Sequence, residues 1–183
     1  MPGYKVGRPR TAAADHLHAM MGHHAWATIR LIDLCSELSP EQLELSTPGT
    51  YGSIHATLEH MVAGDYRYQI RMTGGQPGPP PSGPPRPLPR LRVEMEKQAR
   101  RWRELLERIE ELDAEMPAEE GPEPYPRIEH AVGLFITQAV HHGNEHRAHV
   151  LSVLGAHGLE APELSGWEYF RFLEESKGGA GPA

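Results

Sequence analysis

The segment from Arg127 to Leu154 reads RIEHAVGLFITQAVHHGNEHRAHVLSVL, and its pattern predicts a long amphipathic helix. Apolar or histidine side chains recur along it every three or four residues, which places them on one face of an α-helix. We call this face the seam of the helix. Its members are Ile128, Val132, Phe135, Ala139, His142, His146, His149 and Val153. Pro126 is expected in the first turn of this helix, and Gly155 is expected to end it.

The same spacing occurs in three earlier segments, so the sequence predicts four helices. Their expected ranges are 12–38, 53–73, 90–116 and 127–154. Ser53 suits the N-cap of the second helix, because its hydroxyl can accept a hydrogen bond from the first turn. A short turn is expected at 40–43. Four amphipathic helices without a strand pattern predict an all-α fold, a four-helix bundle with a short C-terminal helix or tail.

Glycine and proline mark the connections between these helices. The 19 glycines and 18 prolines gather mainly in residues 73–90, 116–127 and 177–183. Proline lacks an N–H group and has a fixed φ, so these stretches are predicted to be loops. The long second connection suits either an ordinary hairpin loop or a crossover. We expect one domain over residues 1–176, followed by a flexible glycine-rich tail over 177–183.

Composition excludes several classes of protein. The 183 residues include a single cysteine, Cys35, so an intrachain disulfide and a zinc site built from cysteines are excluded. The net charge of −7 argues against a dedicated nucleic-acid binder and against binding to an anionic membrane surface. The sequence contains no run of about 18 apolar residues, so it predicts no transmembrane helix. The N-terminus lacks the apolar core of a signal peptide, so a cytoplasmic location is expected.

The histidines of the last helix carry the strongest chemical signal. His142 and His146 are four residues apart, so both imidazoles lie on one helix face, at positions where the seam otherwise holds apolar residues. Buried ring nitrogens need partners, and either a divalent metal or ordinary hydrogen bonds would supply them. A metal would also need a ligand from another helix. The candidates are His23, His24, His55 and His60.

These candidates differ in their surroundings. His60 lies on the side of its helix that carries small residues, which suits either a ligand or a flanking histidine at a helix boundary. His24 lies on the seam of the first helix and suits a ligand, a proton relay or a packed core histidine. His55 is expected to be exposed and paired with Glu59. His141 is expected to point away from the site.

Several other polar residues near these histidines have open roles. Arg147 suits either a substrate carboxylate or a salt bridge to a neighbouring helix. Cys35 is predicted to be a small buried hydrophobe. No catalytic residue is assigned. The residues considered as a general base are Glu59, Asp65, Tyr68 and Glu145.

Several stretches resemble the DinB/YfiT-like metalloenzyme family over roughly residues 15–172. They are LEHMVAGDYRY around His60, AVHHGNEHRAHVLSVLG around His142 and His146, and GWEYF at 166–170. The resemblance implies a four-helix bundle in which His60, His142 and His146 hold a divalent metal, zinc or nickel. One departure concerns His149, where the family commonly has glutamine after H-R-G. Its role is left open as a hydrogen-bond partner, a substrate contact or a competing ligand.

The resemblance also implies a class of activity. Characterised relatives include transferases and isomerases that use low-molecular-weight thiols such as bacillithiol or mycothiol. We therefore expect a metal-dependent enzyme acting on a small-molecule substrate, such as a thiol-dependent S-transferase. The alternatives are a metal-dependent hydrolase and a non-catalytic bundle that binds a small molecule or a partner. The resemblance also implies a homodimer, because members of the family often form dimers through bundle helices, and two-fold dimers are the commonest assemblies.

Overall fold

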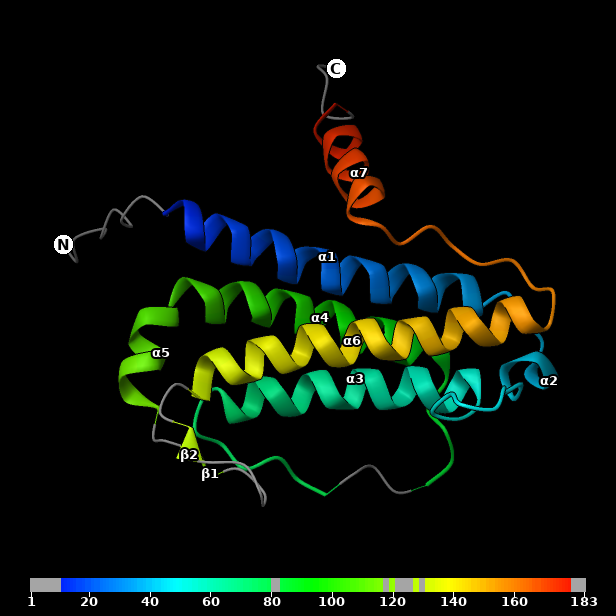
Figure 1. Ribbon diagram of the computed structural model, residues 1–183, viewed down its shortest axis with the longest axis horizontal. Coiled ribbons are helices and arrows are strands. Elements are labelled where there is room, and N and C mark those ends of the chain that lie inside the picture. Colours follow the sequence, from blue (N-terminus) through cyan, green and yellow to red (C-terminus); the bar gives the residue numbers. More distant parts are fainter. Residues whose placement is uncertain (1–10, 80–82, 117–118, 121–126, 129–130, 179–183) are drawn as a thin grey trace.

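The computed structural model describes residues 11–79, 83–116, 119–120, 127–128 and 131–178 (Figure 1). Four long helices lie side by side, and they confirm the predicted all-α bundle. They are α1 (Ala12–Cys35), α3 (Ile54–Arg71), α4 (Leu88–Glu107) and α6 (Ala131–Ala156). The shorter elements are α2 (Pro40–Leu43), α5 (Ile109–Glu115), α7 (Gly166–Gly178) and an antiparallel pair of strands, β1 (Glu119–Glu120) and β2 (Arg127–Ile128).

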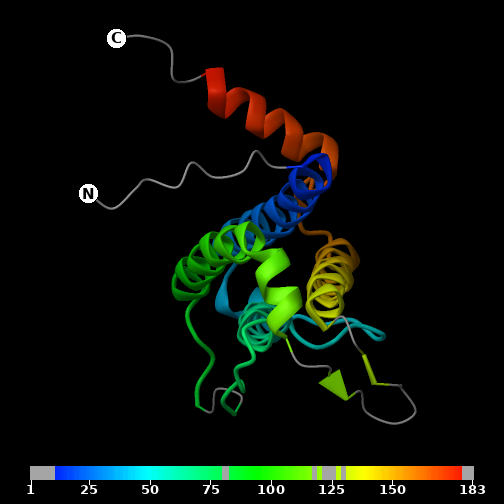
Figure 2. The ribbon, with the colours of Figure 1, turned by 90° about the vertical axis from the view of Figure 1, so that its left-hand side faces the viewer.

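The four long helices occupy the corners of a square in the end-on view of Figure 2. α1 packs against α4 and α6, and α3 packs against the same two helices, so α1 and α3 lie on a diagonal. Two contacts show that α3 and α4 run in the same direction. Glu59, near the start of α3, pairs with Arg86 just before α4. Asp65, further along α3, binds Trp102, which lies further along α4. The proline-rich second connection is therefore a crossover that returns along the bundle (Figure 1).

Local capping explains where several helices begin. The Ser53 hydroxyl accepts a hydrogen bond from the Ala56 N–H at 3.2 Å, which confirms Ser53 as the N-cap of α3. The expected turn at 40–43 is α2, where Ser39 and Gln42 form a reciprocal capping box.

The C-terminal end of α6 corrects one prediction. Gly155 lies inside the helix, and Gly158 ends it with a φ of +67°. The Leu159 N–H donates to the Leu154 carbonyl at 2.9 Å, and the Gly158 N–H donates to the Gly155 carbonyl at 3.2 Å. This is a Schellman motif, which needs a left-handed residue one position after the cap. Glycine adopts that conformation without steric cost, so it is Gly158 that stops α6.

Two predicted helices also have different bounds. The segment predicted as one helix over 90–116 starts at Leu88 and breaks at Arg108, after which α5 crosses the end of the bundle (Figure 1). The break places Leu112 in the core, where it is 6% exposed. The helix predicted over 127–154 begins only at Ala131, because the backbone at 127–128 pairs with 119–120. Pro126 lies outside the described residues.

The core consists of two clusters and contains the single cysteine. One cluster is formed by α1, α3, α4 and the C-terminal half of α6, and the second surrounds Trp102 near α5 and the start of α6. Cys35 is fully buried, and burial raises the pKa of its thiol to about 12. Its predicted role as a small buried hydrophobe is confirmed, since a thiol with that pKa stays protonated and unreactive at neutral pH.

The C-terminal helix α7 stands away from the bundle and contacts α1 (Figures 1 and 2). Tyr169 is buried at this contact, with its ring 5.5 Å from that of Trp26. By contrast, Trp167 is 90% exposed. Lys177 and Gly178, which were expected in the tail, belong to α7, and residues 179–183 lie outside the described part. No described helix is long and apolar enough to cross a membrane.

Candidate metal centre

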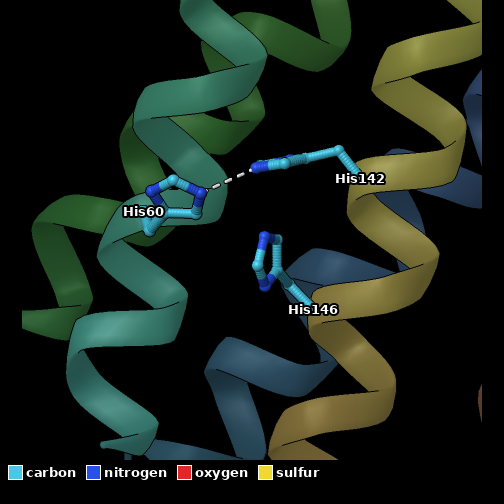
Figure 3. A group of neighbouring side chains, drawn as sticks. All are labelled: His60, His142 and His146. Carbon is cyan, nitrogen blue, oxygen red and sulfur yellow. Dashed lines mark hydrogen bonds between the residues drawn. The ribbon is translucent and has the colours of Figure 1, made fainter. Parts of the chain in front are cut away.

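Three histidine rings from two helices converge in the middle of the bundle (Figure 3). His142 and His146 project from successive turns of α6, and His60 projects from α3 opposite them. The Nε2 atoms of His60 and His142 are 2.9 Å apart. One ring nitrogen from each of the three residues lies within 4.8 Å of the others. The structure thus brings together the three residues that the family resemblance implied as ligands.

The neighbouring residues leave room for these rings and cover part of them. A Cβ placed on Gly64 of α3 would lie 2.6 Å from the Cε1 atom of His142, so the absence of a side chain there admits the ring. Tyr51 stacks on His60 with 4.2 Å between ring centroids and meets His146 edge-on at 5.0 Å. Sequence reasoning missed Tyr51, because it lies in the non-periodic loop before α3.

The site favours neutral imidazoles. Burial, together with the neighbouring His146 and His60, lowers the pKa of His142 to about 4. Burial also lowers the pKa of His60 and of His146 below their usual value. A neutral imidazole keeps a nitrogen lone pair, which is the form that binds metals. The three rings therefore offer donor atoms at neutral pH.

The donor set fits a divalent metal. Zinc–nitrogen bonds of about 2.0–2.1 Å place the nitrogens of a tetrahedral site about 3.3 Å apart, which is close to the spacing of His60 and His142. The Nδ1 atom of His146 is buried and has no hydrogen-bond partner among the described residues. Three imidazoles leave a coordination position open, as catalytic sites do, and such ligands suit both zinc and nickel.

The other candidate histidines lie outside this group. The Nε2 atom of His24 lies 2.8 Å from an Asp65 carboxylate oxygen, so His24 is a packed core histidine. His23 donates to the Leu164 carbonyl at 2.7 Å. The predicted exposure of His55 is wrong, because His55 is half-buried and donates to the Arg86 carbonyl at 2.7 Å. It does lie close enough to Glu59 to help lower the pKa of that carboxyl group.

The two remaining histidines of α6 differ from each other. His141 is exposed, and its Nε2 atom lies 3.9 Å from a Glu145 carboxylate oxygen, which confirms that it points away from the site. The ring of His149 lies 5.3 Å from that of His146, and its buried Nδ1 atom lacks a partner among the described residues. His149 therefore borders the group without joining it.

Arg147 has neither of the roles that the sequence left open. Its guanidinium is buried, and it donates to the Thr28 hydroxyl at 2.9 Å and to the His24 carbonyl at 3.2 Å. Burial lowers the pKa of Arg147 to about 10, although the negative charge of Asp65 acts in the opposite direction and raises it. Arg147 therefore ties α6 to α1 through uncharged acceptors, and it is enclosed away from any substrate carboxylate.

Of the residues considered as a general base, only Tyr68 lies at the centre. Its ring meets that of His142 edge-on at 5.7 Å. Asp65 is 3% exposed and accepts hydrogen bonds from His24 and Trp102, each at 2.8 Å. Glu59 and Glu145 are engaged elsewhere, with Arg86 and His141.

Fold and site together define a four-helix-bundle protein with three buried or half-buried histidines arranged to suit a divalent metal. The DinB family profile matches residues 13–176, so the chain belongs to the DinB family, as the motifs around its histidines indicated. No curated protein sequence matches this chain.

A substitution that removes no ligand atom should still disturb this centre. Gly64→Ala puts a methyl group against the His142 ring, so we expect the affinity for zinc to fall about 10-fold or more, as when a ligand loses its supporting contacts. Gly133→Ala is the matched control, because nothing lies within 4 Å of a Cβ there and both glycines are within helices. Competition with a zinc chelator would measure both affinities. Equal affinities for the two variants would contradict the expected role of Gly64.

Proposed function

We propose that this protein is a divalent-metal-dependent enzyme whose metal ligands are His60, His142 and His146. The convergence of three neutral imidazoles from α3 and α6 carries the proposal. Zinc or nickel bound there would supply a Lewis acid that lowers the pKa of a water molecule or holds a substrate thiol as its thiolate.

Among these reactions, transfer from a low-molecular-weight thiol is supported best. Within the described residues, no carboxylate joins the three-histidine group, and Asp65 is committed to two hydrogen bonds in the core. A hydrolase usually needs a general base to handle the protons of water, whereas a thiol held as thiolate is already an active nucleophile. The histidine-only donor set therefore favours S-transfer over hydrolysis.

Two tyrosines would shape the surroundings of the substrate. Burial raises the pKa of Tyr68, so its hydroxyl keeps its proton at neutral pH and can donate a hydrogen bond. Tyr51 is 51% exposed and stacks on His60, which leaves one face of its ring toward solvent. We propose that Tyr51 covers the ligand ring from water and that Tyr68 orients a substrate polar group beside His142.

A conjugation assay tests this function. Protein purified without a histidine tag is loaded with zinc or nickel and mixed with bacillithiol or mycothiol and the fluorogenic electrophile monochlorobimane. We expect conjugation at least about 100-fold faster than with the His142→Ala/His146→Ala variant, because the ligands are needed for the thiolate. Rates that do not change on adding a chelator would refute the proposal. Metal-dependent cleavage of p-nitrophenyl acetate without conjugation would support the hydrolase instead.

A further inference from the structure

A cavity lies between α3 and α4, beneath the crossover segment at 77–79. Its volume is about 470 Å³, within the range of small-molecule sites. None of the three metal-centre histidines lines it, and its wall on α3 is formed by Val62, Ala63, Tyr66, Arg67 and Gln69. The cavity therefore belongs to the α3–α4 interface, whereas the histidines belong to the α3–α6 interface.

The rim of this cavity is positively charged. Arg67, Lys97 and Arg101 line it, and none of them forms an ion pair with an acid among the described residues. Lys97 and Arg101 are one turn apart on α4, so their charges lie on the same face. Arg86 and the carboxylate of Glu94 also line the cavity, where they pair with each other, and Glu59 binds Arg86 as well. Three unpaired cations around one hollow stand out in a chain of net charge −7 and favour an anionic group.

The wall of the cavity contains two unsatisfied hydrogen-bond acceptors. The Gln69 amide nitrogen donates to the Gln98 carbonyl at 2.9 Å, and the Gln98 amide nitrogen donates to the Val62 carbonyl at 3.0 Å. These bonds fix which end of each amide is the nitrogen. Both side-chain oxygens are left buried without a partner in the described part of the chain, although both residues line the cavity. Buried acceptors without partners are costly, so a ligand N–H or O–H would relieve them.

The remaining lining is apolar or aromatic. Val62, Ala63, Pro77 and Pro79 present hydrocarbon surface, and the Tyr66 ring is 48% exposed beside them. We propose that this cavity is a binding site for a small organic anion with an apolar or aromatic body, an acidic group and an N–H or O–H donor. Lys97 and Arg101 bind the acidic group, Gln69 and Gln98 accept from the donor, and the apolar residues hold the body.

A fluorescent probe with these three features tests the site. 8-Anilinonaphthalene-1-sulfonate has an aromatic body, a sulfonate and an N–H, and N-phenyl-1-naphthylamine has the same body without the sulfonate. We expect the sulfonate to bind at one site, and Lys97→Gln/Arg101→Gln to weaken it about 10-fold or more, because two charge-assisted contacts are lost. The affinity of the neutral amine should change less than about 2-fold. Unchanged binding of the sulfonate to this variant would overturn the proposal.

Three further variants distinguish this cavity from other surfaces. Arg100→Gln/Arg103→Gln removes the same charge from exposed positions of α4, and it should leave both affinities unchanged. Ala63→Phe should abolish binding of both probes by filling the cavity, with circular dichroism confirming a folded protein. Trp167→Ser/Phe170→Ser removes the two most exposed aromatic residues of α7 and should keep binding intact. Loss of binding in the first or third variant, or retention in Ala63→Phe, would refute the site.

The site is independent of the proposed metal chemistry. The His142→Ala/His146→Ala variant should bind the sulfonate with the wild-type affinity, because neither residue lines the cavity. If that variant loses the probe, the probe reports the metal centre and the proposal fails. Failure of the thiol-conjugation assay would leave the expected probe results unchanged.

Discussion

The His142→Ala/His146→Ala variant is expected to lose its divalent metal, whereas the wild-type protein should hold about one ion per chain. His142 and His146 supply two of the three converging imidazoles, and His60 alone would leave an ion with a single protein ligand. We therefore expect the zinc affinity to fall at least about 100-fold, which exceeds the effect of removing a supporting contact. Elemental analysis of protein purified without a histidine tag or a nickel column would measure the content and identify the metal.

His141→Ala is the matched control for this loss. His141 lies directly beside the ligands on α6, but it is exposed and paired with Glu145. Its removal should leave the metal content unchanged, and His60→Ala should reproduce the loss from the other helix. If both the double variant and His60→Ala retained the metal, the ion would have to bind at another site.

Metal removal should also lower the melting temperature of the wild-type protein. A ligand present at 100 times its dissociation constant stabilises the folded state by about 2.7 kcal/mol, and a chelator withdraws that stabilisation. The double variant has no such ion to lose, so its melting temperature should not respond to the chelator. Melting curves recorded with and without chelator check this difference, and an equal response of the two proteins would contradict it.

Asp65→Ala should destabilise the fold by about 3–5 kcal/mol, because it removes the anion from a buried charged network. Asp65 is 3% exposed, accepts from His24 and Trp102 at 2.8 Å each, and lies near the buried cation of Arg147. Its removal leaves two buried donors unpaired and the Arg147 charge uncompensated. The loss should appear as a lower urea midpoint with an unchanged slope.

Asp33→Ala is the control for a carboxylate in another environment. Asp33 on α1 pairs with Arg92 on α4, but both side chains are well exposed, at 47% and 40%. Water and salt screen such a pair, so its removal should cost no more than about 1 kcal/mol. Trp102→Phe keeps the aromatic packing and removes one donor, and we expect an intermediate cost of about 1–3 kcal/mol. If Asp65→Ala and Asp33→Ala had equal effects, the network would have no special role in stability.

Most features that depend on one helix at a time were predicted correctly, although the residue that ends α6 is Gly158 and not Gly155. The helical segments, the Ser53 cap and the shared face of His142 and His146 all follow from the helical repeat and from bonds within one turn. Even so, the helix bounds were wrong where distant backbone intervened. Residues 127–128 pair with another strand, so α6 begins later than predicted. The predicted helix over 90–116 breaks at Arg108, and the break places Leu112 in the core.

Only the tertiary structure shows which residues of other helices lie against each helix face. Residue patterns left both His60 and His24 open as ligands, and only the family resemblance chose His60. The structure places His60 opposite His142 and His146 of α6, whereas His24 forms a hydrogen bond with Asp65. The crossover and the enclosed position of Arg147 likewise depend on how the helices pack. The sequence by itself determined which side chains share a helix face, because that follows from the 3.6-residue repeat. Only the tertiary structure decided which faces meet, because that depends on packing the whole core at once.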